Sequence, residues 1–383
     1  MLKKINKKIL NYLKYLLSKK VITLKPECKS KGNVLISYII TPFLKKRKNN
    51  LNYLSHTNVW ECYKIANIYL KFGYTVDVIN WDNKEFIPKK KYKVFIDIHS
   101  NLERLSTIIN NDCIKILHIT GAHWLYQNTS EYKRLLELQK RKNVTLIPRR
   151  IAPFSLGIEN ADLAIILGNE FTINTFRYAS KPMYRIPVSS SVLFDYNENK
   201  NFNDCKRNYL WIGSIGLAHK GLDLVLEAFS QLPDYNLTVC GPIKEEKDFE
   251  KAYFDELYNT KNINTVGWVD ISSMEFKKIV NNCIGVIYPS CSEGGGGSVI
   301  TCLHTGLIPI VSYEASVDVL DFGFVLKELS IEEIIKNVKT VSSLGINELK
   351  LKSKKAWEYA RKYHTRGSFA AEYEKFVRNV LKL

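Results

Sequence analysis

The sequence predicts an α/β fold with two Rossmann-like domains in tandem, because short apolar runs alternate with amphipathic segments along most of the chain. At 383 residues the chain is too long for one ordinary core. Its content of 45% hydrophobic and 25% charged residues is that of a folded globular protein. A polar stretch, residues 195–207, interrupts the alternation and marks the expected domain boundary.

Each half shows its own series of expected elements. In residues 21–200 we expect a helix near 59–72 and strands at 34–39, 76–79, 94–98, 114–119 and 161–168. In residues 208–345 we expect strands at 209–213, 235–240, 283–288 and 307–312, and helices at 222–229, 249–258, 275–281 and 298–305. Residues 357–383 carry apolar side chains at helical spacing and should form one amphipathic helix.

Positive charge is concentrated in the first half of the chain. Residues 1–205 hold 34 Lys and Arg against 16 Asp and Glu, whereas residues 206–383 hold 22 of each. Such a field favours anionic partners such as a lipid headgroup surface or a phosphate-bearing acceptor, although exposed lysines also simply keep a protein soluble. The basic half shows no recognisable nucleic-acid-reading motif, so we expect no nucleic-acid partner.

Residues 1–20 predict a basic amphipathic helix, with seven apolar side chains on one side of the helical wheel and five lysines on the other. This helix could lie on an anionic membrane face, or it could dock on the protein's own core. The sequence shows no signal peptide and no apolar run near the ~20 residues that cross a bilayer. The eight cysteines are scattered without C-x-x-C spacing. We therefore expect a cytoplasmic protein, with peripheral attachment to the inner membrane face as an alternative.

Two loops of the second half follow expected strands, where ligands of α/β sheets bind. The loop 213–221 contains Ser214 and Lys220 and opens a helix, so its backbone N–H groups and the lysine could bind an anion. The second loop runs from Glu293 through four glycines to Ser298. Each glycine costs about 0.5–1 kcal/mol in an ordered element, so four together indicate close backbone approach to a ligand. A flexible linker and a plain turn with a surface lysine are the alternatives.

These motifs resemble the donor domain of retaining glycosyltransferases of the family 1/family 4 group. The resemblance runs in order and spacing through residues 210–214, 219–229, 266–269, 288–294 and 306–312. It implies the GT-B fold, in which two Rossmann-like domains are joined by a C-terminal helix that crosses back to the first. We therefore expect residues 350–383 to pack on the first domain.

The resemblance also implies roles for individual residues. Lys220 would hold the donor diphosphate, and Glu293 would contact the transferred sugar as the first glutamate of an E-x7-E motif. Thr301 stands where the family has its second glutamate, and Ser214 stands where many members have an arginine. We assign donor binding to Ser214, Lys220, Gly294, Gly295, Gly296, Gly297, Ser298 and Thr301.

In the first half we expect residues of the acceptor side of the cleft. Thr57 and Asn58 precede a long helix, and His123 follows a strand beside a glycine, close to the reacting sugar. We name His123 with Glu293 as catalytic, with a structural hydrogen-bonding role as the alternative. Arg149 and Arg150 could meet an acceptor phosphate, or they could form a solvated charge pair.

The predicted reaction moves a sugar from a nucleotide-sugar, the co-substrate, to a hydroxyl of a glycan or lipid-linked acceptor in cell-surface glycan or glycolipid biosynthesis. Lys220 and loop N–H groups would stabilise the departing diphosphate, so we expect no metal and no further cofactor. Retention of configuration is implied by the resemblance alone. A nucleotide-sugar epimerase and a non-catalytic nucleotide-sugar-binding protein are the rival hypotheses.

Overall fold

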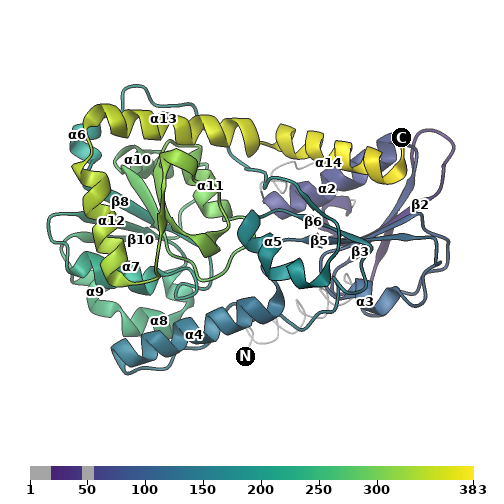
Figure 1. Cartoon of the computed structure of the whole chain (residues 1–383), viewed down its shortest axis with the longest axis horizontal. Coiled ribbons are helices and arrows are strands. Elements are labelled where there is room, and N and C mark those ends of the chain that lie inside the picture. Colours follow the sequence, from purple (N-terminus) through teal and green to yellow (C-terminus); the bar gives the residue numbers. More distant parts are fainter. Residues whose placement is uncertain (1–18, 45–55) are drawn as a thin grey trace, which may run out of the picture.

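The computed structural model describes residues 19–44 and 56–383, which form two α/β domains lying side by side (Figure 1). The amphipathic helix expected at residues 1–20 lies outside the described residues apart from its last two. None of the helices in the described parts of the chain is both long and apolar enough to span a bilayer.

The first domain is built on a sheet of seven described strands, in the order β1-β3-β2-β4-β5-β6-β7. All neighbours are parallel except β1, an unpredicted edge strand that pairs antiparallel with β3. The strand order reverses between β2 and β4, because β3 lies on one side of β2 and the later strands from β4 onward lie on the other. The carboxyl ends of β2 and β4 therefore border a crevice. The strands are β1 (Val21–Leu24), β2 (Asn33–Tyr38), β3 (Thr75–Asn80), β4 (Val94–Asp97), β5 (Ile114–Ile119), β6 (Leu163–Ile166) and β7 (Met183–Arg185).

The second domain has a fully parallel sheet in the order β10-β9-β8-β11-β12-β13, with its reversal between β8 and β11. This is the strand order of a dinucleotide-binding Rossmann fold. Its central strands are buried along nearly their whole length, as their continuous apolar runs predict. They are β8 (Asn208–Ile212), β9 (Asn236–Cys240), β10 (Ile263–Gly267), β11 (Gly285–Tyr288), β12 (Ile308–Ser312) and β13 (Phe324–Leu326).

The helices cover these sheets and join them. In the first half they are α2 (Thr57–Lys71), α3 (Asn101–Leu105), α4 (Trp124–Lys142), α5 (Glu170–Phe176) and α6 (Phe202–Cys205). In the second half they are α7 (Leu222–Ser230), α8 (Lys247–Ala252), α9 (Phe254–Tyr258), α10 (Met274–Asn281), α11 (Gly297–Leu303), α12 (Ile331–Ser343), α13 (Ile346–Tyr363) and α14 (Arg366–Leu381). The single helix expected at 249–258 is thus divided between α8 and α9.

Helix α4 follows a strand of the first domain but packs on the second, below it in Figure 1. Leu138 of α4 and Leu146 just after it belong to the apolar core of the second domain. Arg141 pairs with Asp223 at 2.6 Å and with Glu227 at 3.1 Å, both on α7. The expectation that residues 21–200 form one self-contained domain is therefore wrong for the α4 segment.

The C-terminal helices run along one side of both domains (Figure 1). Thr365 ends the continuous helix expected at 357–383, because its side chain accepts from the Ser368 N–H and starts α14 as a new helix. Only α14 packs on the first domain, where Phe369 and Tyr373 are fully buried beside α2. α13 packs on α11 and β12 of the second domain. The crossing helix is confirmed, but it is shorter than the segment 350–383.

Replacement of Phe369 by alanine should destabilise the first domain by about 3–5 kcal/mol, since it removes a fully buried ring that packs against Trp60. Denaturant unfolding followed by circular dichroism measures this loss. Phe254→Ala is the matched control, because that ring is 53% exposed on the second domain. Equal effects of the two substitutions would contradict the docking of α14.

Candidate functional site

The candidate site lies at the strand reversal of the second domain, beyond the carboxyl ends of β8 and β11. The loop after β8 carries Lys220, and the loop after β11 carries Glu293. A Cβ atom on Gly221 would lie 2.4 Å from the carbonyl oxygen of Pro289, so the two loops are in direct backbone contact. Neighbouring parallel strands therefore bring together two residues that are 73 positions apart.

Lys220 and Glu293 form a buried ion pair between Lys220 Nζ and Glu293 Oε1. The same carboxylate oxygen accepts from the Tyr288 hydroxyl at 2.9 Å and from the Ser290 hydroxyl at 3.2 Å. Lys220 Nζ also lies 3.0 Å from the Tyr288 hydroxyl. Glu293 Oε2 accepts no hydrogen bond from any described residue, so this oxygen can bind a ligand hydroxyl.

Glu293 is held in its ionised form. Burial would raise the pKa of the carboxyl, but the charges of Lys220, Arg150 and His219 lower it to about 2. Arg150 follows α4, the helix that leaves the first sheet and packs on the second domain, so a segment of the first half contributes to this charge cluster. Because Glu131 pairs with His219, these three cations face two carboxylates, and the one remaining positive charge favours an anionic ligand.

The backbone of the 213–221 loop is less free than the sequence suggested. The N–H groups of Gly216 and Leu217 donate to Glu246 at 2.5 and 3.2 Å. Those of Lys220 and Gly221 donate to carbonyl oxygens within the loop. The anion site predicted from this loop is therefore limited to the side chain of Lys220 and to the N–H groups that these bonds do not use.

Three of the four consecutive glycines serve packing. A Cβ atom would lie 2.3 Å from the Thr120 carbonyl oxygen at Gly294, and 2.5 Å from Val188 at Gly295. Both neighbours belong to the first domain. At Gly296 a Cβ would lie 2.4 Å from Val317, and only Gly297, at the start of α11, has nothing within 4 Å. These contacts explain why the first three positions need glycine, since they permit close contact between the domains and within the second, and the approach of the run to a ligand stays a prediction.

Gly294→Ala should lower the melting temperature and destabilise the protein by about 1–3 kcal/mol, because the added methyl overlaps backbone of the first domain. Gly297→Ala should leave the melting temperature unchanged or raise it slightly, since its methyl meets no atom. Differential scanning calorimetry distinguishes the two variants. A tolerated Gly294→Ala would show that the domains do not meet at this loop.

A pocket of about 340 Å³ opens beside the ion pair, at the carboxyl ends of β8, β9 and β10. Ser214 and Ser298 line it, as predicted for donor-binding residues. Trp268, which sequence reasoning did not assign to the site, also lines it with 73% of its surface exposed. Thr301 does not line this pocket, because it is buried in α11 and its hydroxyl donates to the Gly297 carbonyl at 3.0 Å.

A second buried ion pair fixes α4 beside this site. His219 Nδ1 lies 2.6 Å from Glu131 Oε2, and His219 Nε2 lies 2.6 Å from the Ser292 carbonyl oxygen. Burial opposes protonation of His219, but hydrogen bonds with Cys291 and Glu131 raise its pKa to about 9. The ring therefore donates from both nitrogens at neutral pH. In this arrangement the buried cluster of Glu131, His219 and Cys291 has no histidine lone pair for a metal ion.

The stabilisation by this ion pair should decrease at alkaline pH. The pKa of His219 is about 9 when folded against 6.5 ordinarily, so its contribution is complete below about pH 6.5 and is lost as the pH rises through about 9. His219→Gln should cost about 3–5 kcal/mol at neutral pH, because Glu131 loses its buried partner. The difference in melting temperature between wild type and variant should shrink from about pH 7 to about pH 10. A constant difference would contradict a protonated His219.

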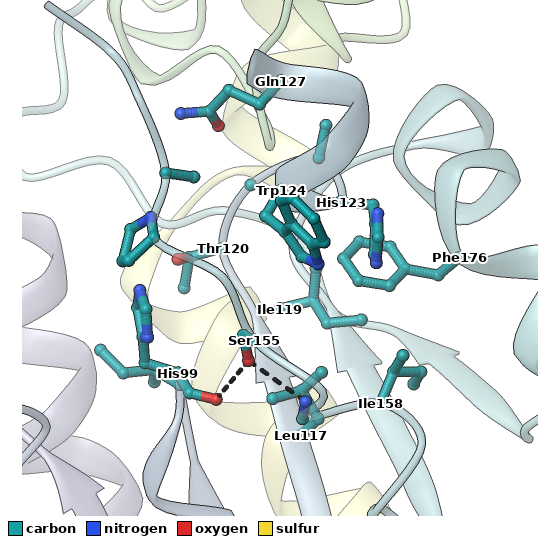
Figure 2. A pocket seen from close by; sticks show the side chains of 16 residues that line it. His99, Leu117, Ile119, Thr120, His123, Trp124, Gln127, Ser155, Ile158 and Phe176 are labelled. Atoms are coloured by element: carbon teal, nitrogen blue, oxygen red, sulfur yellow. Dashed lines mark hydrogen bonds between the residues drawn. The ribbon is translucent and has the colours of Figure 1, made fainter. Parts of the chain in front are cut away.

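The first domain has its own cavity of about 160 Å³, at the carboxyl ends of β4 and β5 (Figure 2). His99, Trp124 and Gln127 line it, together with the predicted His123. The Nδ1 atom of His99 is buried without a hydrogen-bond partner, and burial lowers the pKa of this ring. His99 is thus a neutral donor or acceptor that sequence reasoning missed, because no motif surrounds it.

The side chain of His123 lines the cavity, but its ring nitrogens form hydrogen bonds within the protein. Its Nδ1 atom accepts from the Leu125 N–H at 3.3 Å and so caps α4, while Nε2 lies 3.1 Å from the Tyr178 hydroxyl. Both ring nitrogens are therefore occupied by protein groups. The arrangement favours the structural alternative over the predicted catalytic role for His123.

The other residues predicted for the acceptor side lie in two different places in the structure. Thr57 and Asn58 begin α2 after its N-cap His56, and no contact joins them to Lys220 or Glu293 among the described residues. Arg149 pairs with Asp248 of the second domain at 2.6 Å. Arg150 lies against the 213–221 loop, where a Cβ on Gly216 would be 2.5 Å from its Cγ atom. Both arginines therefore lie against the second domain, and their predicted acceptor-side or cleft role stays a prediction.

Comparison with protein families gives a match for residues 195–362, to the family described as Glycosyl transferases group 1. No curated protein matches the chain. The matched segment begins in the predicted boundary and contains both Lys220 and Glu293.

Solved structures resemble the chain over both domains. Sucrose-phosphate synthase from Thermosynechococcus elongatus has a TM-score of 0.61 and 14% identity, over 92% of this chain and 99% of that chain. Anabaena HepE, solved with UDP and glucose, has a TM-score of 0.55 and 11% identity, over 92% and 100%. S. aureus TarM, solved with Fondaparinux, alpha-GlcNAc-glycerol and UDP, has a TM-score of 0.53 and 15% identity over 76% of this chain, which spans only 55% of TarM. These likenesses establish the GT-B fold.

Proposed function

Because residues 195–362 form a domain of the glycosyl transferases group 1 family, we propose that the protein transfers a sugar from a nucleotide-sugar to an acceptor hydroxyl. The observation that carries the proposal is the Lys220–Glu293 ion pair at the strand reversal of the second sheet. A ligand of an open α/β sheet binds at such a reversal. A cation beside an ionised carboxylate matches a ligand that carries both a diphosphate and sugar hydroxyls.

The pocket beside the ion pair suits the nucleoside part of the donor. Trp268 offers an exposed ring on which a base can stack, and Ser214 and Ser298 offer hydroxyls for hydrogen bonds. Lys220, near the end of the 213–221 loop, would then bind the diphosphate. The UDP ligands of HepE and TarM support UDP as the first nucleotide to test.

Lys220 would stabilise the negative charge that develops on the diphosphate as the bond to the sugar breaks. Glu293 would orient the sugar by accepting a hydroxyl hydrogen bond at Oε2, since Oε1 is held by Lys220, Tyr288 and Ser290. Its pKa of about 2 keeps the carboxylate ionised throughout the neutral range, so it acts as an acceptor and not as a proton donor. Retention of anomeric configuration rests on the resemblance to retaining members of the family.

The cavity of the first domain is the candidate acceptor site. It opens at the carboxyl ends of β4 and β5, and its wall includes Thr120 and Gly121, the residues that Gly294 contacts. Trp124 provides an aromatic face for a sugar ring, and the ring of His99 lines the same cavity. The excess of basic residues in the first half supports a phosphate-bearing glycan or lipid-linked acceptor at an anionic surface.

Glu293→Gln should reduce sugar transfer by about 100-fold or more, because the amide neither balances Lys220 nor accepts as strongly from a sugar hydroxyl. The assay measures nucleoside diphosphate released from a panel of nucleotide-sugars, with and without simple glycoside acceptors. Glu328→Gln is the control and should keep most activity, because this exposed glutamate of the second domain lines neither of the two pockets.

The same assay separates the rival hypotheses. Isomerised donor without any acceptor would identify an epimerase, and donor binding without turnover would identify a non-catalytic binding protein. Full transfer activity in Glu293→Gln would place the reacting sugar elsewhere.

A further inference from the structure

The second domain by itself offers little net positive charge for a diphosphate. It contributes Lys220 and His219 at the site, and these are already paired with Glu293 and Glu131. Ser214, where many family members have an arginine, is exposed and uncharged at the edge of the nucleotide pocket. Because a bound diphosphate carries at least two negative charges, binding it here calls for a further cation.

Arg150 of the first domain lies at this place. Its side chain packs against Gly216 in the loop that also carries Ser214 and Lys220. Its charge helps to lower the pKa of Glu293, and it opposes the rise that burial and Glu293 give to the pKa of Tyr288. The guanidinium Nε atom is buried and has no hydrogen-bond partner, and no described carboxylate forms an ion pair with it. Arg150 therefore brings an uncompensated positive charge to the Lys220–Glu293 pair.

The backbone of Arg150 is fixed in this position by α4. Its N–H donates to Glu131 Oε1 at 3.2 Å, and its carbonyl oxygen accepts from Gln127 at 2.6 Å. Glu131 also binds His219, the neighbour of Lys220 in sequence. The Glu131 carboxylate thus fixes the backbone of Arg150 and the side chain of His219, the residue before Lys220. The side chain of Arg150 forms no ion pair with a described residue, whereas that of Arg149 pairs with Asp248.

We propose that Arg150 supplies the second cation that binds the donor diphosphate, in place of the arginine that Ser214 replaces on the second domain. This inference rests on the proposed function and makes donor binding a property of both domains together. A planar guanidinium can bind two phosphate oxygens at once, which an ammonium group cannot do with the same geometry. The donor then binds across the domain interface, with its diphosphate between Lys220 and Arg150.

The test measures binding of nucleoside diphosphates to the full chain. Thermal shift with UDP, GDP and ADP first identifies the diphosphate that stabilises the wild type, and calorimetry then gives its dissociation constant. Arg150→Gln should weaken binding by about 10- to 100-fold, the loss expected for a bidentate charged contact. Arg149→Gln is the matched control and should change the dissociation constant by less than about 2-fold, because Arg149 pairs with Asp248.

Two further variants make the test independent of folding defects. Arg150→Lys keeps the charge and should lose less affinity than Arg150→Gln. The double variant Arg150→Gln with Ser214→Arg should recover affinity, because it returns a cation to the other side of the same site. Wild-type affinity in Arg150→Gln, or an equal loss in Arg149→Gln, would overturn the role of Arg150 while leaving the proposed function intact. If the wild type binds none of these diphosphates, both the role of Arg150 and the proposed function are overturned.

Discussion

The buried ion pair between Glu131 and His219 is the interaction on which the site depends. Glu131 belongs to α4, a helix that leaves the first sheet and packs on the second domain. With one oxygen it binds His219, and with the other it binds the N–H groups of Arg149 and Arg150. Because a buried carboxylate without a partner is costly, this pair adds to the apolar contacts and the Arg141 ion pairs that hold α4 on the second domain. Lys220 and Arg150 are thereby held at one place.

This constraint makes the two domains one binding unit. The domains are joined at α4, at the glycine run that meets Thr120 and Gly121, and at α14, which crosses back to α2. In the common view of two-domain enzymes, closure brings separate half-sites together. Here the charge cluster around Glu293 already contains groups from both domains. Motion between the domains would therefore change the electrostatics of the candidate site directly.

The two departures from the family pattern have different structural outcomes. Thr301 lies in α11, and its hydroxyl donates to the Gly297 carbonyl of the same helix. Its side chain therefore does not replace the second glutamate of the pattern. Ser214 lines the pocket of the second domain, in the same loop as Gly216, against which Arg150 packs. A lost charge can thus be supplied from another element when the fold brings one close, whereas a position buried inside a helix cannot be used by a ligand.

The sequence by itself determined the two parallel sheets and the meeting of Lys220 with Glu293, because apolar runs specify buried strands and ligand loops follow their carboxyl ends. It also indicated that the backbone of Gly294–Ser298 is constrained, but it did not identify the neighbouring groups that impose the constraint. Only the tertiary structure decided that α4 packs on the second domain, that Arg150 lies beside Glu293, and that His123 caps a helix. Helical periodicity shows which face of a helix is apolar but not which domain covers it. A pair such as Glu131 and His219, 88 residues apart, leaves no local pattern to detect.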